Sequence, residues 1–180
     1  AYFVWAQFRL TLQQPTRTFE HEHSLHNGFT DDDIAANVQN YLSNNPADVL
    51  LLHIGTNDFD TSPNAVQTIL NNIDSFSQGD EDGRRITVVL ARIMRSVDGS
   101  LDVNTFNENV ETMAETRIDN GDKIIMVDMQ DGAGLVYSIG GGGDFVDNLH
   151  PNDGGYVKVS DQWYTKLDTF LPMVESPQIT

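Results

Sequence analysis

Three short, almost purely apolar runs limit what this chain can fold into more than any other feature. They cover residues 48–54 (DVLLLHI), 85–91 (RITVVLA) and 123–127 (KIIMV). Runs of this kind are typical of strands in a parallel sheet that is buried on both faces. Helical segments are expected after Asp31 and over residues 63–76, 103–119 and 153–170. The alternation predicts a single α/β domain over residues 1–180, with helices covering both faces of a parallel sheet.

The N-terminal part of the chain does not follow this alternation. Residues 2–13 (YFVWAQFRLTLQ) are apolar enough to predict a buried helix, which residues 14–16 then break. Residues 17–30 are rich in histidine, and we expect them to be irregular. The acidic run 31–33 suits the start of the next helix, through capping and the helix dipole.

The charge balance excludes several classes of partner. The formal net charge is −17, from 27 acidic and 10 basic residues, so we expect no nucleic-acid partner and no attraction to anionic membranes. No cysteine is present, which excludes disulfides, thiolate metal sites and a cysteine nucleophile. No apolar run approaches the length of a membrane-spanning helix. No signal peptide is visible, but a secreted chain whose signal peptide has been removed would look the same. We therefore expect a secreted protein and keep a cytoplasmic location open.

Two polar motifs stand at informative positions. Gly55-Thr56-Asn57-Asp58 directly follows the first apolar run, and Asp147-Asn148-Leu149-His150-Pro151 lies near the end of the chain. Ligands of open α/β sheets bind beyond the carboxyl ends of the strands, which is where the first motif falls. In this order the two motifs resemble the third and fifth conserved blocks of SGNH (GDSL-type) serine ester hydrolases. Gly28, in the segment 26–30, resembles the glycine of the family's second block.

The resemblance extends to one branch of that superfamily. Ala91-Arg92-Ile93, Phe106-Asn107, Val127-Asp128-Met129 and the run 150–156 are similar to the carbohydrate-esterase branch, whose members remove acetyl groups from xylan and related sugars. The resemblance implies a flavodoxin-like three-layer α/β/α fold and a serine esterase that acts on small acyl esters, with acetylated carbohydrate as the substrate. It implies no cofactor and no metal.

The same resemblance assigns roles to four residues. His150 would be the general base and Asp147 would orient its ring, as in a Ser-His-Asp triad. Asn57 would donate its side-chain amide to the oxyanion, and Gly28 would donate its backbone N–H. We expect Asp58 to be structural.

The nucleophile of this reaction has no counterpart in the sequence. SGNH enzymes carry their serine in Gly-Asp-Ser, whereas the Gly-Asp pairs here precede Glu81, Lys123 and Phe145. Three explanations stay open: the serine lies on a fragment elsewhere, a second chain or swapped subunit completes the sheet, or the fold has rearranged. Ser24, close to Gly28, is a lesser candidate.

Two alternatives from other classes also stay open. The chain could be a noncatalytic module that binds carbohydrate or protein, with Phe59, Tyr156 and Trp163 as aromatic candidates, although Trp163 sits on a helix and is expected in the core. The cluster His21, His23 and His26, with Glu22, could hold a transition metal for a metal-dependent hydrolase.

Overall fold

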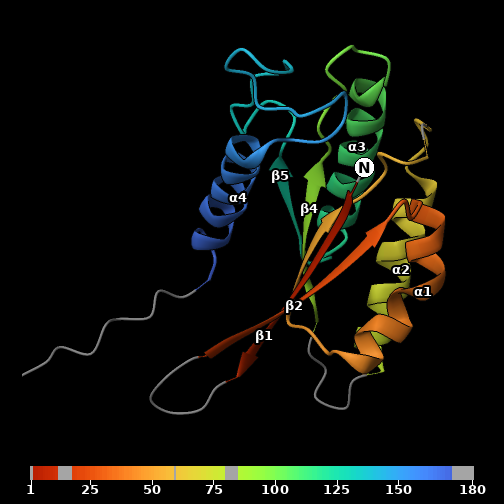
Figure 1. Cartoon of the computed structure of the whole chain (residues 1–180). Coiled ribbons are helices and arrows are strands. Elements are labelled where there is room, and N and C mark those ends of the chain that lie inside the picture. Colours follow the sequence, from red (N-terminus) through yellow and green to blue (C-terminus); the bar gives the residue numbers. More distant parts are fainter. Residues whose placement is uncertain (1, 12–17, 59, 80–84, 172–180) are drawn as a thin grey trace, which may run out of the picture.

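The computed structural model describes residues 2–11, 18–58, 60–79 and 85–171, with side chains described from Gly28 onwards. Five strands form one sheet in the order β2-β1-β3-β4-β5 (Figure 1). The strands are β1 (Tyr2–Thr11), β2 (Thr18–Asn27), β3 (Val49–His53), β4 (Thr87–Arg92) and β5 (Ile124–Asp128). The helices are α1 (Asp31–Asn44), α2 (Asn64–Gln78), α3 (Val103–Asp119) and α4 (Asp153–Asp168).

The three apolar runs form the parallel part of the sheet, as the sequence predicts. Leu51 of β3 is in register with Val89 of β4, which is in register with Ile125 of β5. The β3 residues are all buried, which is expected for a strand that has helices on both of its faces.

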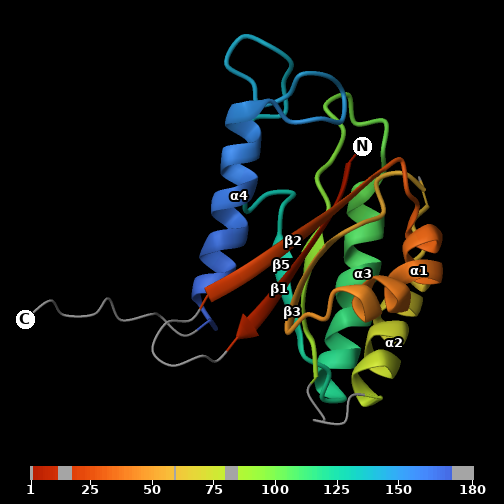
Figure 2. The same cartoon turned by 60° about the horizontal axis from the view of Figure 1, so that its bottom comes forward.

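Helices cover the two faces of the sheet unequally, with α1, α2 and α3 on one side and α4 on the other (Figures 1 and 2). Because side chains alternate along a strand, Leu50 and Leu52 pack in the core beneath α1, α2 and α3. Val49 and Leu51 point the other way and pack in the core beneath α4. The result is the three-layer α/β/α arrangement.

The prediction of a helix over residues 2–13 is wrong, because Tyr2–Thr11 forms strand β1, antiparallel to β3. The expectation of an irregular segment at 17–30 is also wrong over Thr18–Asn27, which forms β2, antiparallel to β1. Apolar composition alone does not separate a helix from a strand, and aromatic and β-branched residues favour strands. The decisive factor is the open edge of β3, whose backbone groups need partners.

The direction of these two strands matters for the site. Since β2 is antiparallel to β1 and β1 is antiparallel to β3, β2 points the same way as the parallel strands. Gly28 therefore follows β2 at the same edge of the sheet where Gly55 follows β3. The position beside β3, for which the sequence indicated no strand, is filled by β1.

The acidic start predicted for α1 is confirmed, and the residues there have different roles. Thr30 is the N-cap, and it forms a capping box with Asp33. Asn152 caps α4 by accepting a hydrogen bond from the backbone N–H of Gly155. None of the helices within the described part of the chain has the length and apolar content needed to cross a membrane.

Candidate active site

The Asp147–His150 turn already has the geometry of a base and its orienting carboxylate. Oδ2 of Asp147 lies 2.7 Å from Nδ1 of His150. Oδ1 of Asp147 accepts the backbone N–H groups of Leu149 and His150, both at 2.8 Å. The carboxylate favours the tautomer with its proton on Nδ1, so that Nε2 is the nitrogen able to accept a proton. The His150 side chain is 26% exposed, so solvent can reach it.

Hydrogen bonds keep this carboxylate charged. The backbone N–H of Leu149, followed by the His150 ring and the His150 backbone, lowers the pKa of Asp147 to about 2. Hydrogen bonding to the charged form of a carboxyl group has this effect. Asp147 is therefore ionised over the whole range in which an imidazole can act as a base.

The loop after β4 holds the turn from the other side. The backbone oxygen of Asn148 accepts the N–H of Val97 at 2.9 Å, and its side-chain oxygen accepts the N–H of Asp98 at 2.9 Å. Within the turn, the N–H of Val146 donates to the backbone oxygen of His150 at 2.9 Å. The base is thus fixed by a segment about fifty residues away in the sequence, in a loop where tertiary contacts decide the conformation.

The second candidate group lies around the turn that follows β3. Nδ2 of Asn57 donates to the backbone oxygen of Phe29 at 2.7 Å, next to Gly28. Gly28 has a φ of +79°, in the left-handed region that glycine adopts without strain. An amide side chain has two N–H donors, so Asn57 can bond Phe29 and still offer a donor to an oxyanion. The structure brings together the two residues predicted to supply oxyanion donors.

Gly55 permits this turn to sit close to α3. Its φ is +117°, and a Cβ atom there would stand 2.4 Å from Cζ of Phe106. A side chain at this position would clash with a buried ring and strain the backbone as well.

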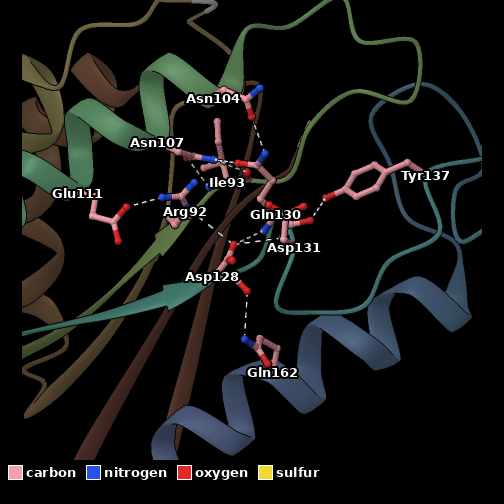
Figure 3. A network of polar contacts seen from close by, with 10 residues as sticks. All are labelled: Arg92, Ile93, Asn104, Asn107, Glu111, Asp128, Gln130, Asp131, Tyr137 and Gln162. Carbon is pink, nitrogen blue, oxygen red and sulfur yellow. Dashed lines mark hydrogen bonds and ion pairs between the residues drawn. The ribbon is translucent and has the colours of Figure 1, made fainter.

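The strand ends beside these turns are tied to α3 by a polar network (Figure 3). Asn107, which is fully buried, accepts the N–H of Ile93 at 2.8 Å and donates to the side chain of Gln130 at 2.7 Å. Arg92 pairs with Glu111, and Nε of Arg92 lies 3.8 Å from Asp128. Three of the sequence matches to the carbohydrate-esterase branch therefore meet in one place, where they support the loops that follow β4 and β5.

Asp31 is a residue of this region whose importance the sequence did not indicate. It is 5% exposed, and its backbone N–H donates to Oδ2 of Asp58 at 2.9 Å. Burial above all, then the hydrogen bond and the charge of Asp58, raise the pKa of Asp31 to about 7. In the sequence Asp31 was one of three acids at a helix start, and nothing local distinguished it from Asp32, which is exposed.

The remaining sequence candidates divide into those that the structure describes and those that it does not. Trp163 is buried in the core beneath α4, as predicted, and Tyr156 is 39% exposed. Phe59 and the side chains of Ser24, His21, His23 and His26 lie outside the described residues.

Comparisons with known proteins agree with this architecture. The chain resembles a family 3 carbohydrate esterase of Clostridium thermocellum, with 21% identity, a TM-score of 0.62 and coverage of 80% of this chain and 67% of that one. It also resembles a family 3 carbohydrate esterase of Talaromyces cellulolyticus, with 18% identity, a TM-score of 0.64 and coverage of 80% of this chain and 69% of that one. A GDSL-like lipase of Bacteroides thetaiotaomicron is similar at 17% identity and a TM-score of 0.56, with coverage of 80% of this chain and 73% of that one. At these identities the likeness shows the fold.

Among proteins of curated function, none matches the sequence. The family comparison is decisive, because the model described as GDSL-like Lipase/Acylhydrolase matches residues 13–163, most of the chain. This chain belongs to the GDSL-like lipase/acylhydrolase family.

Proposed function

We propose that this chain supplies the base and the oxyanion donors for hydrolysis of small acyl esters, with acetylated carbohydrate as the substrate. The family is one of acylhydrolases. The observation that carries the proposal is the Asp147–His150 pair, with Nδ1 held 2.7 Å from the carboxylate. The substrate class rests on the similarity to two carbohydrate esterases.

The reaction follows from these groups in two half-steps. Nε2 of His150 takes the proton of a serine hydroxyl while the serine oxygen bonds to the ester carbonyl carbon, and negative charge moves to the carbonyl oxygen. Asn57 and Gly28 donate N–H groups to that oxygen. The C–O bond to the alcohol then breaks, and the alcohol leaves with the proton from His150. Water repeats the sequence on the acyl-serine and releases the acid.

The proposal places the nucleophile on a polypeptide outside these 180 residues, since they contain no Gly-Asp-Ser. Ser24 is the alternative inside the chain. The two cases differ in which serine a fluorophosphonate would label, because such reagents react with an activated serine next to a general base.

The experiment uses protein expressed from its own gene locus and purified with any polypeptide that accompanies it. Hydrolysis of 4-nitrophenyl acetate and of acetylated xylo-oligosaccharide is measured for the wild type, His150→Ala and, as a matched control, Asp153→Asn, an exposed acid in the first turn of α4. Fluorophosphonate labelling and intact mass under denaturing conditions then locate the serine.

We expect hydrolysis that His150→Ala abolishes and Asp153→Asn leaves intact, with the label on a Gly-Asp-Ser serine. Hydrolysis that survives His150→Ala would overturn the proposal. A label on Ser24 would keep the reaction and move the nucleophile into this chain.

The second candidate function is a noncatalytic module that binds carbohydrate, and the absence of Gly-Asp-Ser from the sequence favours it. It predicts binding of xylo-oligosaccharide by calorimetry with no release of acetate. Turnover that depends on His150 would exclude it.

A further inference from the structure

Two carboxyl groups meet between the turns that carry the candidate oxyanion donors. Asp31 is the first residue of α1, directly after the turn of Gly28–Thr30, and Asp58 directly follows Asn57. Oδ2 of Asp58 accepts the backbone N–H of Asp31 at 2.9 Å, and hydrogen bonding to the Asp58 side chain is one of the causes that raise the pKa of Asp31. A hydrogen bond between two carboxyl groups requires a proton on one of them, and two neighbouring carboxyl groups favour a state in which one of them stays protonated.

Helix capping does not explain the burial of Asp31. The capping box of α1 is complete without it, because the Thr30 hydroxyl accepts the N–H of Asp33 and the Asp33 carboxylate accepts the N–H of Thr30. Asp32 lies exposed in the same first turn, where its charge suits the helix dipole. Asp31 instead turns inward and is 5% exposed, although burying a carboxyl group generally costs free energy.

The position of the pair suggests its use. The Asn57 side chain bonds the backbone oxygen of Phe29, and Asp58 bonds the backbone N–H of Asp31. These two hydrogen bonds, on either side of Thr30, join the β2–α1 turn to the β3–α2 turn. The two candidate oxyanion donors, the N–H of Gly28 and the amide of Asn57, stand on the two turns that this junction joins.

We propose that Asp31 and Asp58 form a positioning pair that shares one proton, and that this proton keeps the Gly28 turn and the Asn57 turn at the spacing an oxyanion requires. The inference rests on the proposed function and deepens it. The shared proton makes assembly of the oxyanion site dependent on pH, and this dependence is separate from the titration of the base.

The charges around the pair set the direction of the effect. The strongest act from Asp58, on the β3–α2 turn, and from Asp32, on α1, and both raise the pKa of Asp31. The helix that packs against α1 is α2, whose one ionisable side chain, Asp74, pairs with Arg117. Loss of the shared proton therefore places a second negative charge beside the first, and the like charges push the two turns apart.

The consequence for catalysis is a fall in kcat above about pH 7, where the pair loses its proton. The loss of one oxyanion donor typically lowers kcat by about 10²–10³-fold. A donor that acts mainly in the transition state changes kcat more than KM. A purely structural role would instead change the free energy of unfolding, without an effect on kcat that exceeds the effect on KM.

The test follows the pair and the donors directly, by NMR on the full chain. The side-chain carboxyl carbons of Asp31 and Asp58, the N–H of Gly28 and the side-chain NH2 of Asn57 are titrated from pH 4 to 9. In the wild type we expect the Asp31 carboxyl carbon, the N–H of Gly28 and the NH2 of Asn57 to report one transition near neutral pH. Asp31→Asn keeps a hydrogen-bond donor toward Asp58 at every pH, so the transition of Gly28 and Asn57 should vanish.

Asp32→Asn is the matched control on the same turn of α1, and it should keep the transition at a somewhat lower pH because one repelling charge is gone. If Asp31 titrates in the ordinary acidic range, or if Gly28 and Asn57 do not respond when it titrates, the inference is wrong. The wild-type titration decides this even if a variant folds poorly.

The two proposals can fail separately. A shared NMR transition without any ester hydrolysis would support the positioning pair and count against the proposed function. In protein that hydrolyses esters, a fall in kcat above pH 7 that Asp31→Asn abolishes, with KM unchanged, would support both. A fall that persists in Asp31→Asn would remove the pair from catalysis.

Discussion

Asp147 contacts the backbone and the imidazole at once, because its Oδ1 accepts two backbone N–H groups and both of its oxygens lie within 2.9 Å of Nδ1 of His150. At the scale of single residues this is the feature that most directly determines the chemistry. The backbone bonds fix the carboxylate, and the carboxylate fixes the tautomer of the base.

Asp147→Asn should lower kcat by about 10²–10⁴-fold with little change in the fold, because an amide donor can turn the imidazole into the wrong tautomer. Initial rates on a soluble acetate ester, in protein that carries its nucleophile, measure the effect, and Asp153→Asn is the control. A loss of less than tenfold would show that Asp147 does not orient the base.

Gly55→Ala should destabilise the protein more than Gly99→Ala, which is a matched control because both glycines have positive φ. A Cβ at Gly99 meets nothing within 4 Å, whereas at Gly55 it meets the Phe106 ring. Backbone strain costs about 1–3 kcal/mol in each variant, and overpacking adds about 1–3 kcal/mol at Gly55. Urea unfolding of both variants gives the difference, and equal losses would contradict the clash.

At the scale of elements, a single helix residue holds two strand ends. Asn107 of α3 bonds the backbone of Ile93, beyond β4, and the side chain of Gln130, beyond β5 (Figure 3). Buried polar groups that depend on one partner make that partner costly to remove.

Asn107→Ala should lower the free energy of unfolding by about 2–4 kcal/mol, since it leaves the N–H of Ile93 and the oxygen of Gln130 without a partner. Asn109→Ala is the control two residues along the same helix, where the side chain is exposed and bonds the backbone oxygen of Thr61. We expect less than about 1 kcal/mol there. Similar losses in the two variants would show that the network does not hold the strand ends.

His53, at the end of β3, adds an acid sensitivity to that strand. It is 5% exposed, its Nε2 finds no hydrogen-bond partner in the described part of the chain, and burial lowers its pKa to about 4. The unfolded chain takes up this proton near pH 6.5 and the folded chain resists it, so stability falls as pH drops from about 6.5 to 4.

His53→Leu should remove this sensitivity, worth at most about 1.4 kcal/mol per pH unit, and should raise stability at pH 5 relative to pH 8. Urea unfolding of the wild type and the variant at both values measures it. An unchanged pH dependence would show that His53 is not the group that titrates.

At the scale of the whole molecule, the excess of acid governs the response to salt. The formal net charge of −17 comes from 27 acidic and 10 basic residues, so the basic residues are too few to pair with most of the carboxylates. Self-repulsion of this kind destabilises the compact state.

Raising sodium chloride from about 0.05 to about 1 M should therefore increase the free energy of unfolding, because the screening length falls to about 3 Å. The ion pairs of Arg117 and Lys158 weaken under the same conditions, but repulsion acts on many more groups. The same unfolding measurement in sucrose separates the two causes, because sucrose is excluded from the protein surface but carries no charge and cannot screen. A fall in stability with salt would show that the pairs dominate.

The sequence by itself determined the features that act over short distances. The apolar runs predicted β3, β4 and β5, and the acidic start predicted α1. Asp147 and His150 are three residues apart and form their contact within one turn. Such features follow from side-chain periodicity and local hydrogen bonding, which a window of a few residues contains.

Only the tertiary structure decided the contacts between distant segments. Residues 2–11 are compatible with a helix by composition, and the unpaired edge of β3 makes them a strand. Asp31 and Asp58 are 27 residues apart, and Asn148 lies 50 residues from Asp98. Burial and hydrogen bonding at such pairs depend on which turns the sheet brings to one edge, and no local pattern of residues records that.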